Sequence, residues 1–120
     1  MNCLFVAIGG ALGATARYGA NQCALYLNLP VFWATLAVNV LGSFLFGVLA
    51  SVLSGGGGWR LLLVVGFLGA FTTFSAFAGE AADIWRQGRM GSLALHILLH
   101  NGLSLAAVFA GGLVASAVKA

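Results

Sequence analysis

Polar side chains recur every four residues within two long apolar stretches, a spacing that places each set on one face of a helix. The first set is Thr35, Asn39, Ser43 and then Gly47, and the second is His96, His100 and Ser104. Their amide, imidazole and hydroxyl groups donate hydrogen bonds, so two such faces in contact would form a polar track for a small ion. Asn39 is the best single candidate for contacting an anion, and a structural bond to another helix is its competing interpretation.

The two histidines also have the spacing of half a zinc site. No cysteine or carboxylate lies near them in the sequence to complete tetrahedral coordination, and there is no HExxH motif. Because histidine titrates near neutral pH, a proton-relay role stays open for His96 and His100. A polar track for a small ion accounts for the whole set better than a metal site does.

Residues 66–77 (GFLGAFTTFSAF) interrupt an apolar stretch that would otherwise form one continuous helix. Gly66 and Gly69 weaken a helix, and the hydroxyls of Thr72 and Thr73 can bond backbone groups that a break sets free. Non-helical backbone inside a membrane is tolerated where it is buried in protein or lines a water-filled cavity. The segment therefore predicts a broken helix that serves an ion or a substrate.

Phe74 and Phe77 follow the expected break and, three residues apart, project from nearly the same face. Packing in a core is the ordinary role of such a pair. The edge of an aromatic ring carries positive charge, however, so two rings presented edge-on would attract an anion without offering it a proton. That arrangement suits a small, poorly polarisable anion.

Length and composition place these residues in an integral membrane protein. The chain has 120 residues, of which 62% are hydrophobic and 6% charged, and no soluble core of that size could use so much apolar surface. About 20 apolar residues span a bilayer as a helix. The sequence predicts one all-α membrane domain of four transmembrane helices, near residues 3–27, 33–54, 59–86 and 92–118, with turns at 28–30, 55–58 and 87–89.

The basic residues indicate how the chain inserts. The formal net charge is +3, but the five basic residues form no patch of the kind that binds nucleic acid. Arg60 and Lys119 fall on one side of the expected membrane domain and Arg86 and Arg89 on the other, so the positive-inside rule selects neither orientation. A chain that inserts both ways up can pair as an antiparallel homodimer, and four helices are too few to enclose a pathway comfortably alone.

Small residues provide candidate surfaces for such a dimer. Gly9 and Gly13 lie four residues apart in the first expected helix, and Gly42 and Gly47 lie in the second. Glycines at such spacings let two helix backbones approach closely. We therefore expect these glycines at the dimer interface.

Charged residues within the expected helices need a partner or a purpose, since a charge at the bilayer centre costs about 2.5 to 3.5 kcal/mol on insertion scales. Arg17 lies deep in the first helix, where it could line an aqueous vestibule that attracts anions; snorkelling to a helix end is the alternative. Glu80 and Asp83 are expected to pair with Arg86 near the membrane interface. No carboxylate lies in the middle of the first, second or fourth span, which argues against a proton-coupled drug exporter.

Three blocks of sequence support a resemblance that extends over the entire chain. They are residues 9–18 (GGALGATARY), residues 35–47 (TLAVNVLGSFLFG), and residues 66–77 followed by Glu80. The chain resembles the Fluc-type fluoride channel family in these blocks, and the third block is the most specific of them.

The resemblance implies an antiparallel dual-topology homodimer with two separate fluoride pores. It further implies a structural sodium ion at the dimer centre, held by backbone carbonyls at the break in the third helix. Gly69 and Thr72 match the sodium-coordinating positions, while Asn39, Phe74 and Phe77 match residues that line the fluoride path.

The resemblance assigns the remaining pore positions as well. They are Ser75 between the two phenylalanines, Arg17 in the vestibule, and a polar track on the fourth helix at His96, His100, Ser104 and Val108. Val108 stands where the family usually has a hydroxyl, and His96 is not the commonest residue at its position.

The resulting prediction is a fluoride-selective ion channel, and not an enzyme, in the cytoplasmic (inner) cell membrane. It would conduct fluoride passively and lower intracellular fluoride and its toxicity. Its expected partners are the fluoride ion, the lipid bilayer and a second copy of the chain. The alternative is a small four-helix multidrug exporter of dual topology, and a third class is a non-conducting assembly subunit.

Overall fold

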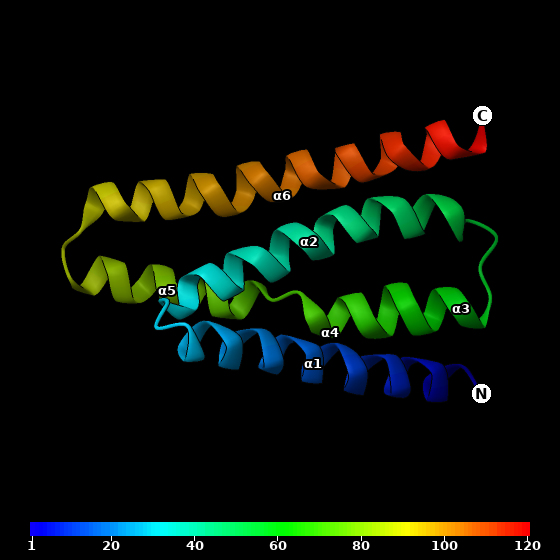
Figure 1. Cartoon of the computed structure of the whole chain (residues 1–120), viewed down its shortest axis with the longest axis horizontal. Coiled ribbons are helices and arrows are strands. Elements are labelled where there is room, and N and C mark those ends of the chain that lie inside the picture. Colours follow the sequence, from blue (N-terminus) through cyan, green and yellow to red (C-terminus); the bar gives the residue numbers. More distant parts are fainter.

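The chain folds into four long helical segments, and a computed structural model describes all of residues 1–120 without a β-strand (Figure 1). α1 covers Asn2–Tyr26, α2 covers Val31–Val52 and α6 covers Met90–Lys119. The third segment has four pieces: α3 (Gly58–Arg60), the π-helix η1 (Leu61–Leu68), α4 (Gly69–Phe71) and α5 (Phe74–Arg86). The prediction of an all-helical fold with four long segments is confirmed, with bounds within about two residues of those expected.

Each segment is long and apolar enough to cross a bilayer. The four contain 25, 22, 29 and 30 residues, and the mean hydropathy of their apolar windows lies between 1.2 and 2.1. About 20 residues suffice for one crossing. The chain is therefore a multi-pass membrane protein.

Short connections at the expected positions make neighbouring segments antiparallel, so both termini lie at one end of the molecule (Figure 1). Asn28 has a φ of 55° in the turn before α2, and Pro30 caps the start of that helix. Gly57 and Gly88 have φ values of 94° and 70° in the other two connections. Asparagine and glycine are the residues that adopt this left-handed region most readily.

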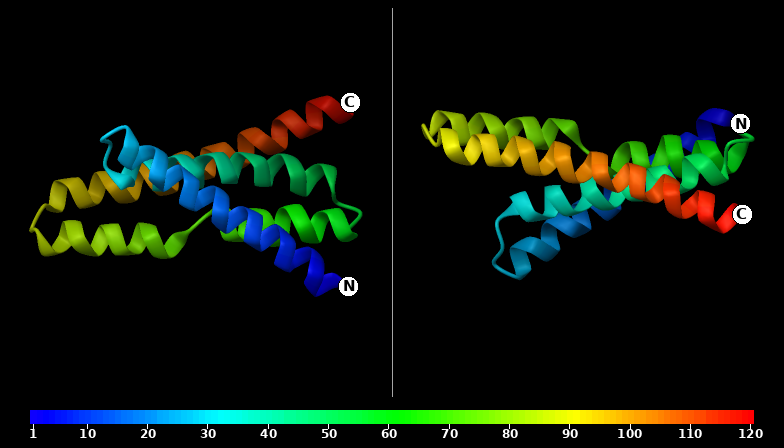
Figure 2. Two further views of the ribbon diagram at one scale, coloured as in Figure 1. Left: turned by 60° about the horizontal axis from the view of Figure 1, so that its bottom comes forward. Right: turned by 90° about the horizontal axis from the view of Figure 1, so that it is seen from above.

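α2 packs against α6, and the two helices cross at an angle (Figure 2). Glycines let the two backbones approach: a Cβ atom at Gly47 would overlap the carbonyl oxygen of Val108, and one at Gly111 would overlap that of Phe44. α2 also contributes Val38 to a small buried cluster with Leu68 and Phe71, which joins it to the third segment.

α1 packs against the first half of the third segment, at η1 and α4. Gly9 faces the carbonyl oxygen of Leu62, and Gly13 faces that of Phe67, so neither position has room for a Cβ atom. The same stretch is wound as a π-helix, a rare conformation that often occurs at functional sites. Nothing in the sequence indicated this change of winding.

The expected dimer-forming role of the glycines is wrong for all four. Gly9, Gly13 and Gly47 face backbone of other segments in the same chain, and a Cβ at Gly42 would overlap the methyl group of Thr72. The spacing correctly indicated close helix packing. A spacing rule cannot specify which helix is the partner, and the partners here lie within one chain.

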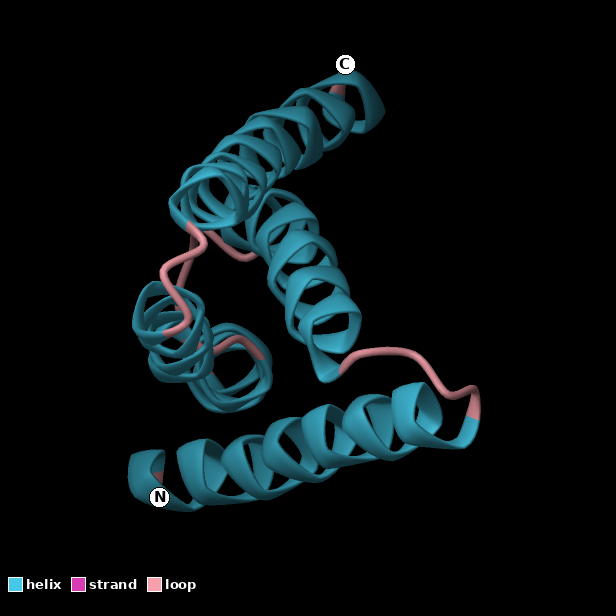
Figure 3. Ribbon diagram, turned by 90° about the vertical axis from the view of Figure 1, so that its left-hand side faces the viewer, coloured by secondary structure: helices cyan, strands magenta, loops and turns pink.

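The third segment is divided into halves that do not share an axis. Thr72 and Thr73 separate α4 from α5, and Figure 3 shows the two halves displaced from each other where the connecting loop joins them. The first half lies against α1, and the second half lies against α6. The displacement opens space beside α2, where the candidate site lies.

Neighbouring glycines of α6 allow a test of the α2–α6 packing. Gly111→Ala would force α2 and α6 apart and should destabilise the fold by about 1 to 3 kcal/mol, the typical cost of overpacking. Gly112→Ala is the matched control, because a Cβ atom there meets nothing within 4 Å. Thermal unfolding in detergent should show a lower midpoint for the first variant alone, and equal midpoints would contradict the packing.

Candidate functional site

The break in the third segment consists of two extended residues. Thr72 has φ −80° and ψ 155°, Thr73 has φ −150° and ψ 117°, and α5 begins at Phe74. The Thr73 hydroxyl accepts a hydrogen bond from the backbone N–H of Ala76 at 3.1 Å, and the Thr72 hydroxyl donates to the carbonyl oxygen of Leu68 at 2.9 Å. A break at this position in the helix is confirmed. The predicted role of the hydroxyls holds for Thr73, whereas the Leu68 carbonyl bonded by the Thr72 hydroxyl also keeps its helical bond from the Thr72 N–H.

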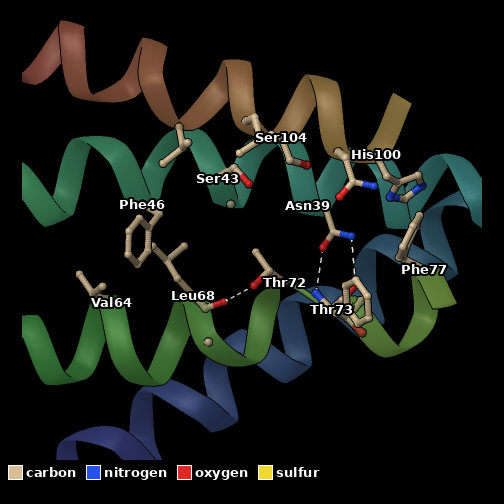
Figure 4. Close-up of a pocket in the computed structure, with 16 residues that line it drawn as sticks. Asn39, Ser43, Phe46, Val64, Leu68, Thr72, Thr73, Phe77, His100 and Ser104 are labelled. Atoms are coloured by element: carbon tan, nitrogen blue, oxygen red, sulfur yellow. Dashed lines mark hydrogen bonds between the residues drawn. The ribbon is translucent and has the colours of Figure 1, made fainter. Parts of the chain in front are cut away.

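Asn39 on α2 binds both backbone groups of Thr73. Its Nδ2 donates to the Thr73 carbonyl at 3.0 Å, and its Oδ1 accepts from the Thr73 N–H at 2.8 Å (Figure 4). The side-chain amide thus pairs with the extended residue much as a neighbouring β-strand would. The structural interpretation of Asn39 is therefore correct, and the second N–H of its Nδ2 group remains for another acceptor.

The break releases the carbonyl groups of Gly69 and Thr72 from the helix. In a continuous α-helix they would accept from the N–H groups of Thr73 and Ala76. Those two N–H groups bond instead to Asn39 and to the Thr73 hydroxyl. Gly69 lies on the exposed surface of the chain and Thr72 is half-buried, so the two residues matched to a sodium site have carbonyls without their helical partners.

A cavity of about 450 Å³ lies between α2, α6 and the third segment around the break. The two polar faces expected from the sequence meet there: Asn39 and Ser43 come from α2, and His100 and Ser104 come from α6 (Figure 4). The Ser104 hydroxyl and both His100 ring nitrogens are buried without a hydrogen-bond partner. The remaining predicted residues of the cavity wall are Gly69, Thr72, Phe74, Phe77 and Val108.

The two phenylalanines lie together but in different surroundings. Their ring centroids are 5.3 Å apart with the planes tilted by 52°. Phe77 is 8% exposed, whereas Phe74 is 75% exposed. Phe77 also stacks on His96, with ring centroids 4.9 Å apart and planes 10° from parallel.

Other predicted site residues lie outside this cavity. Arg17 is half-buried on α1 with its Nε atom unpartnered, and it belongs to neither cavity of the chain. The Ser75 hydroxyl is 3.1 Å from that of Thr73 and does not line the cavity. His96 lines a second cavity of about 440 Å³, next to Glu80 and Arg89.

Glu80 has partners that the sequence interpretation missed. Asp83 pairs with Arg86 at 2.7 Å as expected, but Glu80 does not. One Glu80 oxygen accepts from the hydroxyl of Thr35 at 2.6 Å, and the other lies 3.9 Å from the Nε2 atom of His96. Glu80 follows Phe77 by three residues, so helical periodicity alone would have placed it on the buried face of α5.

Known proteins similar to this chain share one family. A profile of CrcB-like protein, Camphor Resistance (CrcB), matches residues 4–112. The chain belongs to this family. "Fluoride-specific ion channel FluC" of Rhizobium etli is 48% identical over 113 residues, with 90% of each chain covered. The protein of the same name from Cereibacter sphaeroides is 48% identical, with 90% of this chain and 89% of that protein covered. The one from Agrobacterium fabrum is 44% identical, with 92% of this chain and 93% of that protein covered.

Removal of the Asn39 amide should destabilise the break in this CrcB-like chain. Asn39→Ala leaves the N–H and carbonyl of Thr73 without partners, at a cost of about 1 to 3 kcal/mol for each buried group left unsatisfied. Asn39→Asp keeps the acceptor but sets an oxygen against the Thr73 carbonyl. Asn101→Ala is the control, since Asn101 is exposed and bonds within its own helix. Thermal unfolding should rank both Asn39 variants below the control, and equal midpoints would contradict the role of the amide.

Proposed function

We propose that the chain is a fluoride-selective channel that conducts fluoride passively across the inner cell membrane and so lowers intracellular fluoride. The observation that carries the proposal is the match to fluoride-specific ion channels over nine tenths of the chain. The cavity supplies chemistry suited to this ion. A dehydrated anion needs several weak donors along its path, so that no single contact holds it.

The groups that would meet fluoride come from three elements. The free N–H of Asn39, the unpartnered hydroxyl of Ser104 and the one N–H of a neutral His100 ring are donors at the cavity wall. Phe74 and Phe77 would offer the positive edges of their rings. We assign Arg17 and Ser75 to the approaches to the pore, because both lie outside the cavity.

The conducting form would be an antiparallel homodimer with two pores. Balanced basic residues permit insertion in both orientations. Phe74, which is 75% exposed beside the break, would be covered by the second chain. In this arrangement the break lies at membrane depth, where freed backbone groups need protein partners.

A structural sodium ion would occupy the centre of that dimer. The carbonyls of Gly69 and Thr72 lack their helical N–H partners, and Gly69 lies on the surface of the chain. Four such carbonyls from two chains would form an oxygen cage suited to a hard cation. The cation would offset the repulsion between carbonyl dipoles that face one another.

Fluoride flux from liposomes tests the proposed function and its pore. Purified chain should release fluoride down its gradient and retain chloride. Phe74→Ile should slow the flux roughly 2- to 10-fold, since an aromatic contact is worth about 0.5 to 1.5 kcal/mol. Phe109→Ile is the matched control, because Phe109 is 69% exposed on α6 and lines neither cavity.

Two results of that experiment would reject the channel. One is the absence of fluoride flux from folded protein, and the other is chloride passage at the fluoride rate. The multidrug exporter would instead show drug-dependent proton release that Glu80→Gln abolishes, because Glu80 is the one carboxylate turned inward.

Removal of sodium tests the proposed ion at the dimer centre. Replacement of sodium by a large organic cation should lower both the dimer fraction and the fluoride flux, since the facing carbonyls would then repel one another. Cross-linking in liposomes measures the first quantity and an ion-selective electrode the second. Unchanged dimerisation and flux after exhaustive removal would count against the sodium site.

A further inference from the structure

The α5–α6 hairpin gathers three metal-ligating side chains into one buried cluster. Glu80, His96 and His100 each place one ligand atom within 4.8 Å of the other two. His96 is 2% exposed and His100 is 4% exposed. The fold thus brings to the two histidines a carboxylate that lies sixteen residues away from His96 in the chain.

Several polar atoms of this cluster have no hydrogen-bond partner within the protein. Both ring nitrogens of His100, the Nδ1 atom of His96 and the Oε2 atom of Glu80 are buried without a hydrogen bond. Buried polar atoms of this kind are uncommon in folded proteins, and a bound ion can satisfy them. An unpartnered atom on each of three residues that lie together points to a shared ligand.

Two outer hydrogen bonds hold the cluster in orientation. Thr35 donates to Glu80 Oε1 at 2.6 Å, which fixes the carboxylate and leaves Oε2 unpartnered. The Nε2 atom of His96 lies 3.1 Å from the carbonyl oxygen of Phe77, which fixes the ring and favours a lone pair on Nδ1. Ligating histidines and carboxylates in metal proteins are oriented by outer bonds of this type.

We propose that Glu80, His96 and His100 form a binding site for a divalent transition metal of the zinc class. Two imidazoles with one carboxylate are a recurrent zinc ligand set that leaves a fourth position for water. Ligand atoms around tetrahedral zinc lie about 3.4 Å apart, so the side chains have to rotate to draw together ligand atoms that lie within 4.8 Å of one another. Imidazole ligands select zinc, cobalt or nickel over magnesium.

The site has an access route from one end of the molecule. Glu80 and His96 line the second cavity, which also includes Pro30 of the α1–α2 connection and Arg89 of the α5–α6 connection. Figure 1 shows these two connections at the same end. His100 lines the first cavity, so the metal would lie in the wall between the two.

Direct metal binding to the purified chain tests the site independently of fluoride conduction. The background is Cys3→Ser with Cys23→Ser, since both cysteines are free and exposed, and the chain should carry no histidine tag. In constant sodium, zinc titrated by calorimetry should bind once per chain while magnesium gives no heat. Cobalt should give the intense visible absorption of a tetrahedral site.

Single substitutions then assign the ligands. His100→Gln breaks no hydrogen bond within the protein. Loss of a residue that only orients a ligand typically weakens metal binding roughly 10- to 100-fold, so loss of the ligand His100 itself should weaken zinc binding by more than that. His96→Gln and Glu80→Gln should do the same. Asp83→Asn is the matched control, because that carboxylate is exposed and pairs with Arg86.

Two results would overturn the proposal. One is the absence of saturable zinc binding to chain whose thermal unfolding shows it to be folded. The other is zinc affinity that stays the same in His96→Gln and His100→Gln. Because neither readout involves flux, failure of the metal site leaves the channel proposal to its own test.

Discussion

The bond between the Asn39 amide and the backbone of Thr73 is the interaction on which the rest of the site depends. A break in an apolar helix leaves N–H and C=O groups that neither lipid nor a neighbouring apolar side chain can satisfy. With one side chain, Asn39 satisfies both the N–H and the C=O group of Thr73. This bond fixes α2 against the third segment and keeps the extended backbone in a defined position.

Once the break is held, the two halves of the third segment can take different partners. The first half is wound as η1 and packs closely on the glycines of α1. The second half turns Phe77 and Glu80 towards α6 and α2. A continuous helix could not direct its first half towards α1 and its second half towards α6 and α2. The break therefore lets one segment pack closely through its first half and make polar contacts through its second half.

The sequence predicted local features well and long-range partners poorly. Hydrophobic stretches, turn residues and the Gly–Thr pattern at residues 66–77 act through neighbouring backbone, so four segments and a break could be derived from them. The bond from Thr35 to Glu80 spans 45 residues and depends on how α2 meets α5, which no local pattern encodes. The expected place of Gly9 and Gly47 at a dimer interface is wrong for the same reason, because a local pattern does not encode which helix they meet. Their spacing indicates close packing without identifying the partner.

The acidic side chains of the protein lie away from the cavity around the break. Both acidic side chains, Glu80 and Asp83, line the second cavity, and neither lines the first. An ionised carboxylate only accepts hydrogen bonds and would repel an anion. Phe77 lines the first cavity and His96 lines the second, and their rings stack with centroids 4.9 Å apart. An anion in the first cavity would therefore lie within a few side chains of Glu80 without sharing a cavity with it.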